Sequence, residues 1–163
     1  DLWTYPDIPP SLYSTRAKML GSAGEALCDV VCMTHGMLSI PVPEFCHFDR
    51  LVVYGKYPLR IQCKVRHSCI NGFYNFQVRR GDPRHPGGVV EYATGDFDIL
   101  AMVFLAERVV KFTANWTTEQ TVALWEIDVL RRAPMASFER ALEFLGIPRI
   151  TDAMPAPIYP AAA

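Results

Sequence analysis

The chain has 163 residues, of which 50% are apolar and 20% are charged. These values are typical of one globular domain with its own core, and they exclude a disordered chain. The formal net charge of −1 provides no global attraction to nucleic acid, so any such binding must use a local basic patch.

The N-terminal segment, residues 1–13, is predicted to be an extended arm because it contains three prolines. Three aromatic residues in it, Trp3, Tyr5 and Tyr13, predict that the arm packs on a surface of this chain or of a partner copy.

A helix is predicted over residues 14–35, with Gly36 just past its end. Apolar positions at helical spacing define its expected buried stripe, which consists of Leu20, Ala23, Leu27, Val30, Val31 and Thr34. Glu25 lies at the edge of this stripe. Gly21 and Gly24 each cost helix stability, which is understandable if the helix approaches another backbone closely and so brings Glu25 near the sheet.

Strands dominate the middle of the chain. Runs of β-branched and apolar residues, with turn residues between them, predict strands over residues 39–42, 48–54, 59–66, 72–78, 97–103 and 109–113. Residues 79–88 are predicted to be an exposed basic loop. The strands on either side of Gly55 form a hairpin, which makes residues 48–66 the centre of the predicted sheet.

Two helices are predicted after residue 117, over residues 118–132 and 137–145, followed by a loose tail over residues 155–163. We expect one domain: an arm over residues 1–13, an α/β core over residues 14–116, and a helical extension and tail over residues 117–163. The second of these helices is too apolar to read DNA bases, so packing on the core or on another subunit is favoured.

Three polar residues meet at the predicted hairpin. Gln62 and Lys64 are two positions apart, so their side chains share one face of the strand. A lysine within an apolar strand is costly to bury without a partner, and Asp49 opens the neighbouring strand. The group is typical of a divalent-metal site with a cation beside it, although an ion pair at a sheet edge would have the same pattern.

With these residues in this order, the chain resembles the PD-(D/E)XK nuclease superfamily, and within it the group I intron homing endonucleases that carry Gln-x-Lys. The resemblance covers about residues 19–113. It rests on Gly24-Glu25, Asp49 and Gln62-Cys63-Lys64, and more loosely on residues 97–100. The residue before Asp49 is Phe48 where the family has proline, and Gln62 replaces an acidic ligand.

The resemblance implies an α/β fold of the restriction-endonuclease-like type, with a mixed β-sheet flanked by helices. It also implies a DNA endonuclease that uses Mg²⁺, with Mn²⁺ as a substitute. Asp49, Glu25 and Gln62 would supply the oxygen ligands, and Lys64 would orient the attacking water and stabilise charge on the phosphate. Cleavage of both DNA strands would need two sites, so a homo-oligomer is expected.

A basic surface is predicted beside this site to contact phosphates, formed by Arg66, His67, Arg79, Arg80, Arg84 and His85. The alternative for the loop residues among them is a solvated loop. A second reading of the whole chain is a catalytically weak or inactive nuclease-fold module that binds nucleic acid or assembles with a partner.

The cysteines give a third, weaker hypothesis. Their number, five, is odd and their spacing fits no disulfide framework, which predicts reduced thiols and a cytoplasmic location. A zinc site is conceivable from Cys28, Cys32, Cys46, His47, Cys63, His67 and Cys69, but buried free thiols are favoured. No apolar run approaches the ~20 residues that span a bilayer, and no signal peptide is recognisable.

Overall fold

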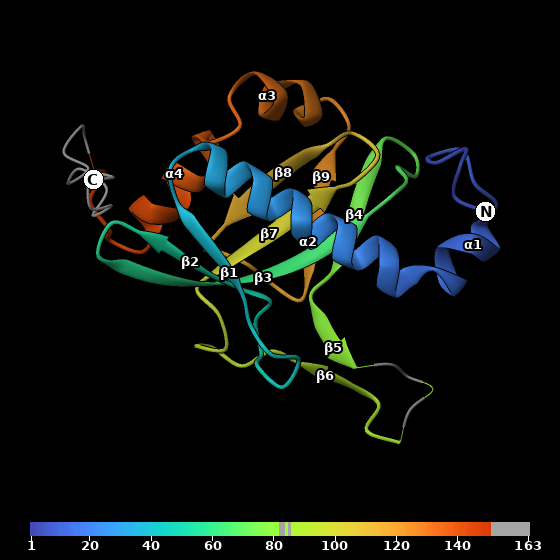
Figure 1. The fold of residues 1–163 in the computed structure, drawn as a ribbon, viewed down its shortest axis with the longest axis horizontal. Helices are drawn as coiled ribbons and strands as arrows, with labels where there is room; N and C mark the ends of the chain where they lie inside the picture. Colours follow the sequence, from blue (N-terminus) through green and yellow to red (C-terminus); the bar gives the residue numbers. More distant parts are fainter. Residues whose placement is uncertain (82–83, 85, 151–163) are drawn as a thin grey trace, which may run out of the picture.

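The computed structural model describes residues 1–81, 84 and 86–150. Its main feature is a mixed five-stranded sheet in the order β1-β2-β3-β7-β8 (Figure 1). Strands β3 and β7 are parallel, and the other neighbours are antiparallel. The strands are β1 (Leu38–Pro41), β2 (Arg50–Tyr54), β3 (Tyr57–Arg66), β7 (Ile99–Phe104) and β8 (Val109–Thr113).

Two smaller antiparallel pairs accompany this sheet. Strand β4 (Phe73–Gln77) pairs with β9 (Glu119–Ala123), and β5 (Arg79–Gly81) pairs with β6 (Val89–Glu91). The β5–β6 pair extends away from the main sheet, toward the bottom of the view in Figure 1.

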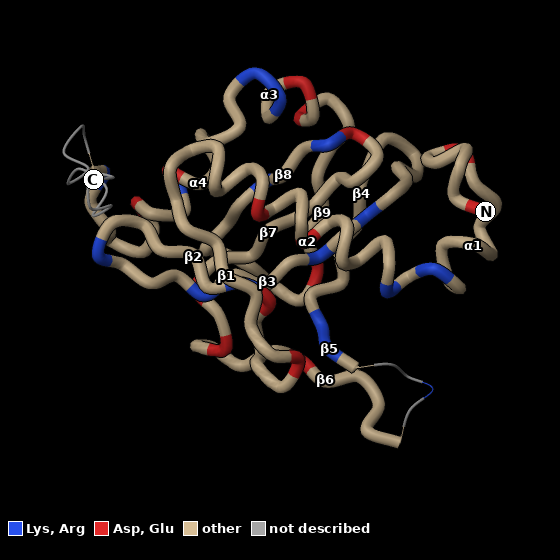
Figure 2. The backbone as a smooth tube through the Cα atoms, viewed as in Figure 1, with Lys and Arg blue, Asp and Glu red and all other residues tan. Residues whose placement is uncertain are grey.

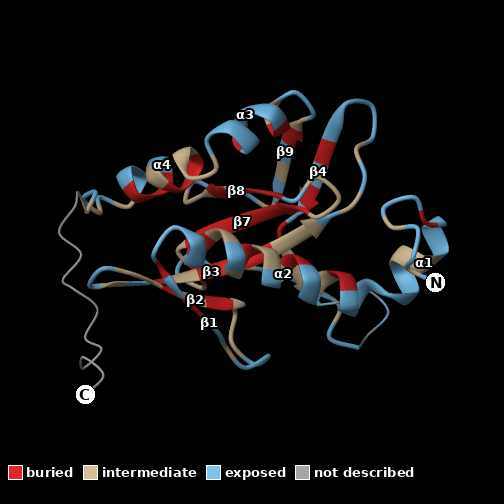
Figure 3. Cartoon of the chain, turned by 45° about the horizontal axis from the view of Figure 1, so that its top comes forward, coloured by how far each residue is buried: buried red, intermediate tan, exposed pale blue. Residues whose placement is uncertain are grey.

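Helices cover one face of the sheet, and a second layer covers the other. Helices α2 (Ala17–Thr34) and α4 (Ala136–Phe144) share one apolar cluster with the sheet, while α3 (Glu126–Arg132) shares the opposite cluster with β4 and β9. All six residues of β7 are buried because the strand lies between these two clusters (Figure 3). Among the described residues, no helix is long and apolar enough to cross a membrane.

The expected fold class, a mixed sheet flanked by helices with a helical C-terminal extension, is confirmed. The hairpin of residues 48–66 is present, and the strands predicted at residues 39–42, 72–78, 97–103 and 109–113 match β1, β4, β7 and β8 within a few residues. Helix α4 packs on β8, as its apolar face predicted. The predicted tail, residues 155–163, lies outside the described residues.

The N-terminal arm was predicted incorrectly, whereas the first predicted helix, residues 14–35, matches α2 within three residues at each end. Residues 1–13 are not extended: turns lead into a short helix, α1 (Pro10–Thr15), which Pro10 begins. Arg16 separates α1 from α2. The expected packing of the aromatic residues holds for Tyr5 and Tyr13, which contact His67, whereas Trp3 is 91% exposed.

The buried stripe of α2 also differs from the prediction. Its buried residues are Leu20, Gly24, Cys28 and Cys32, whereas Ala23, Val30 and Thr34 are exposed. A Cβ at Gly24 would overlap Val65 Cγ2 and lie 3.0 Å from Val65 Cγ1. Helix α2 therefore packs on β3 through its glycine and cysteine side, which confirms the close approach predicted for Gly24. Nothing lies within 4 Å of a Cβ built at Gly21.

Two further elements need correction. The helix predicted over residues 118–132 is a strand followed by a helix, because the β-branched Thr121 and Val122 pair with β4 and bury Val122. The loop predicted over residues 79–88 begins with strand β5, in which Arg79 and Arg80 are half-buried.

Candidate active site

Asp49 lies just before β2 begins, and hydrogen bonds to the backbone of β3 hold it in place. Its backbone N–H donates to Ile61 O over 2.9 Å. Its Oδ2 accepts one hydrogen bond from the Cys63 N–H, at 2.8 Å, and another from Gln62 Nε2, at 2.5 Å. Burial raises the pKa of Asp49, although the Cys63 hydrogen bond and the charge of Lys64 oppose that shift.

Gln62 is buried and uses its amide nitrogen in this contact. Nε2 donates to Asp49 and also to Cys63 O, the latter over 3.1 Å. Rotating the amide group by 180° exchanges its oxygen and nitrogen, and this rotation would be needed to present Oε1 to a cation held by Asp49. In the geometry observed, Gln62 positions Asp49.

Lys64 is half-buried on the same strand and has two neighbours. Its Nζ donates to Arg79 O over 2.7 Å, and it lies 3.4 Å from the Tyr92 hydroxyl and 5.2 Å from the centre of the Tyr92 ring. Burial lowers the pKa of Lys64, and the negative charge of Asp49 opposes that shift. Tyr92, which sequence reasoning missed, therefore covers one side of the ammonium group.

Glu25 lies on α2 and is linked to the site by an arginine that the sequence analysis did not predict. Arg50 is buried, and its guanidinium lies 3.1 Å from Glu25 Oε2 and 2.8 Å from Asp29 Oδ1. Ser39 Oγ donates to the same Asp29 oxygen over 2.6 Å. The signal in the sequence was the i, i+4 spacing of Glu25 and Asp29, which places two carboxylates on one side of a helix.

The carboxylates of Glu25 and Asp49 line one open cavity of about 660 Å³, together with Arg50 and Lys18. Burial raises the pKa of Glu25, and the negative charge of Asp49 raises it further, although Arg50 opposes both effects. Two partly buried carboxylates that repel one another fit a hard divalent cation, because its charge would offset both the burial and the repulsion. Glu25 and Asp49 are therefore the residues that could hold a divalent cation, with water in its remaining positions.

Histidines and cysteines give no comparable cluster. Among the described residues, no three His, Cys, Asp or Glu side chains gather where they could hold a metal ion. Cys28, Cys32 and Cys63 are free thiols in the apolar core, and Cys46 and Cys69 are free and half-buried. Three of the five cysteines thus lie in the apolar core, as the favoured prediction of buried thiols expects, and two do not.

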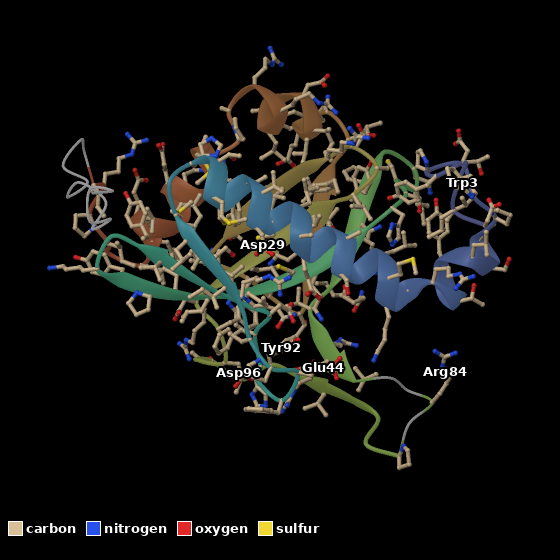
Figure 4. All side chains as sticks on the ribbon, viewed as in Figure 1. Trp3, Asp29, Glu44, Arg84, Tyr92 and Asp96 are labelled. Atoms are coloured by element: carbon tan, nitrogen blue, oxygen red, sulfur yellow. The ribbon has the colours of Figure 1, made fainter. Side chains whose placement is uncertain are left out.

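His47 has a structural partner on each side. Its Nδ1 lies 2.9 Å from Asp96 Oδ1, and its Nε2 lies 2.6 Å from Arg80 Nη1. Asp96 also accepts the Ala93 N–H, so this chain of contacts joins the loop before β7 to the β5–β6 hairpin. Figure 4 shows the neighbouring side chains Tyr92 and Asp96 on the side of the sheet where that hairpin emerges.

Five of the six predicted phosphate-contacting residues lie in the described part of the chain, and these five do not form one surface. Arg79 lies beside Lys64, which donates to its carbonyl oxygen, and Arg80 contacts His47. Within the described part of the chain, the Nε atom of each arginine is buried without a hydrogen-bond partner. Arg66 donates to Asn75 O on β4, and His67 stacks on Tyr13 at 4.9 Å between ring centres. Arg84 is exposed and projects from the hairpin (Figure 4), whereas His85 lies outside the described residues.

A second cavity, of about 420 Å³, adjoins the larger one and is lined by part of this basic set. It is lined by Arg66, His67 and Tyr13, and it shares Gly21 and Glu25 with the larger cavity. In the view of Figure 2, basic and acidic residues are interspersed along the chain. Local basic groups beside the two cavities are thus the charge feature that bears on the site.

Comparison with known proteins identifies the class of fold. The chain matches no protein-family profile, and it matches no curated protein sequence. A solved structure with the same fold is that of a bacterial homing endonuclease, I-Ssp6803I. The match covers 78% of this chain and 91% of that chain, with 19% sequence identity and a TM-score of 0.58. The fold is therefore that of a homing endonuclease.

Proposed function

We propose that this chain is a metal-dependent DNA endonuclease of the PD-(D/E)XK type, with Gln-x-Lys in its central strand. The observation that carries the proposal is the meeting of Glu25 and Asp49 in one cavity, with Gln62 and Lys64 on the adjoining strand. The likeness to I-Ssp6803I, a homing endonuclease, supports the same reading.

Each of the four side chains would have a different role in cleavage. Asp49 and Glu25 would hold Mg²⁺ or Mn²⁺, which when bound acidifies a water and neutralises charge on the phosphate. Gln62 keeps Asp49 oriented through its 2.5 Å hydrogen bond. The Lys64 ammonium would orient the attacking water and stabilise the phosphate, and for this it must leave Arg79 O.

Cleavage of supercoiled plasmid and of a pool of linear and branched DNA, with Mg²⁺, Mn²⁺ or EDTA, tests the proposal. We expect metal-dependent cutting by the wild type and none by Asp49→Ala or Lys64→Ala. Lys56→Ala is the matched control, because Lys56 is an exposed lysine in the turn between β2 and β3. Unchanged turnover in both site variants would refute the proposed roles.

The second candidate is a nucleic-acid-binding or assembly module without cleavage. It is favoured by the hydrogen bond from Lys64 Nζ to Arg79 O and by the lack of charge on Gln62. It predicts that the wild type and the Lys64→Ala variant retain DNA equally, with no cutting under any metal. Absence of both cutting and retention would indicate a role in assembly.

A further inference from the structure

Helix α2 contains two glycines, and packing on the core explains only one of them. A glycine inside a helix costs about 1 kcal/mol relative to alanine. Gly24 is buried and lets α2 approach Val65 on β3 closely. A Cβ built at Gly21, by contrast, has nothing within 4 Å outside its own helix among the described residues. Glycine is also the residue used where a ligand passes close to the protein backbone.

Gly21 lies on the boundary between the two cavities of the candidate site. It lines the larger cavity, which contains Asp49, and also the smaller cavity, which is lined by Arg66 and His67. The two cavities share one other residue, Glu25, which lies one helical turn after Gly21 on the same side of α2. The cavities therefore meet beside Glu25, where position 21 carries no side chain.

Arg66 gives the smaller cavity a group that suits a phosphate. The residue is exposed, and its guanidinium uses only Nε in a hydrogen bond to the described residues, donating to Asn75 O. That hydrogen bond orients the guanidinium and leaves its terminal N–H groups for a paired contact with an anion.

His67 gives the same cavity a second, neutral donor. Its ring stacks on Tyr13 at 4.9 Å between ring centres, and its Nδ1 lies 3.2 Å from the Tyr5 hydroxyl. Burial raises the pKa of Tyr5 to about 12, so Tyr5 keeps its proton and can donate it to Nδ1. The imidazole then carries its own proton on Nε2, which can donate to a phosphate oxygen.

We propose that the cleaved DNA strand crosses α2 at Gly21, with the phosphate to be cut in the larger cavity and a neighbouring phosphate in the smaller one. Arg66 and His67 would hold the neighbouring phosphate and so fix the position of the reacting phosphate beside Asp49. A side chain at position 21 would stand between the cavities and keep the strand out of one of them. This inference rests on the proposed endonuclease function.

Anisotropy of a fluorescent duplex of about 30 base pairs and arbitrary sequence, in EDTA, tests the crossing point. We expect Gly21→Leu to weaken binding about tenfold or more. The Tm should stay at or above the wild-type value, because leucine favours a helix and position 21 is open. Ala23→Leu is the matched control, since Ala23 is exposed on the same helix and lines neither cavity. It should leave the affinity unchanged.

Arg66→Gln tests the neighbouring phosphate. Removing one phosphate contact should reduce the slope of the logarithm of the binding constant against the logarithm of the salt concentration by about 1. Arg132→Gln, at an exposed position on α3, should leave that slope unchanged. In the Gly21→Leu background, Arg66→Gln should cause little further loss of affinity, because the strand no longer reaches Arg66.

Four results would overturn the proposal: a wild type that does not bind the duplex, a Gly21→Leu variant that binds as the wild type does, a lower Tm in that variant, or additive losses from the two substitutions. Cleavage of plasmid with Mg²⁺ is scored separately. Binding that depends on Gly21 without any cutting would refute the endonuclease assignment but support the DNA path. Cutting by a wild type whose affinity does not depend on Gly21 would do the reverse.

Discussion

Arg50 Nη1 lies 3.1 Å from Glu25 Oε2, so a partly buried ion pair joins strand β2 to helix α2 beside the candidate active site. Arg50 also contacts Asp29 and donates to the backbone carbonyl of Asp49 over 2.8 Å. One guanidinium therefore holds together the helix, the strand and the loop that carry the two candidate metal ligands.

Removing this guanidinium should be costly. Arg50→Met leaves Glu25 and Asp29 without their cation. Because both carboxylates keep some contact with solvent, the cost should be below the roughly 3–5 kcal/mol of a fully buried pair. Urea unfolding measures the loss. Arg132→Met, at an exposed position, should change the free energy of unfolding by less than about 0.5 kcal/mol. Equal effects at both positions would show that Arg50 has no special structural role.

Gly24 and Gly21 should respond oppositely to alanine. Gly24→Ala places a methyl group against Val65 and should destabilise the protein by about 1–3 kcal/mol, even though alanine favours a helix. Gly21→Ala meets no atom within 4 Å and should stabilise it by about 0.5–1 kcal/mol. Adding Val65→Ala to Gly24→Ala should recover stability in a double-mutant cycle, and strict additivity would contradict the clash.

The raised pKa of Asp49 gives a pH dependence of defined sign. Burial makes the folded state bind this proton more tightly than the unfolded state does, so ionised Asp49 destabilises the fold. That penalty is present at pH 7 and disappears as the pH falls through the folded-state pKa. We expect Asp49→Asn to raise the Tm at pH 7 by about 2 °C or more, with a smaller difference near pH 4. A Tm gain that does not depend on pH would exclude ionisation as its cause.

Lys64 should set the alkaline limit of cleavage. Burial lowers the pKa of Lys64. If cleavage needs the ammonium form of Lys64, the cleavage rate should therefore fall at a lower pH than it would with a lysine of ordinary pKa. Lys64→Arg keeps the charge at all accessible pH values but alters the geometry, so it should cleave more slowly and lose the alkaline limb. Single-turnover rates from about pH 7 to 10 provide the measurement. The same limb in Lys64→Arg would assign it to another group.

The hairpin and its polar residues could be predicted because their signals are local. Turn residues between two apolar runs define the strands of residues 48–66, and the two-residue spacing places Gln62 and Lys64 on one face. Strand β9 was not predicted because Glu119 and Gln120 are typical of the first turn of a helix. The segment forms a strand because it pairs with β4, which is remote in sequence.

Sequence by itself determined the mixed α/β architecture, the central hairpin, and the order of Glu25, Asp49, Gln62 and Lys64, because periodicity and turn chemistry act between near neighbours. Tertiary structure alone decided that Arg50 joins Glu25 to the site, that Tyr92 and Arg79 enclose Lys64, and which side of α2 is buried. Those outcomes depend on contacts between segments far apart in the chain. Apolar residues occur on two opposite sides of α2, and the close approach of the helix to β3 at Gly24 determines which side is buried.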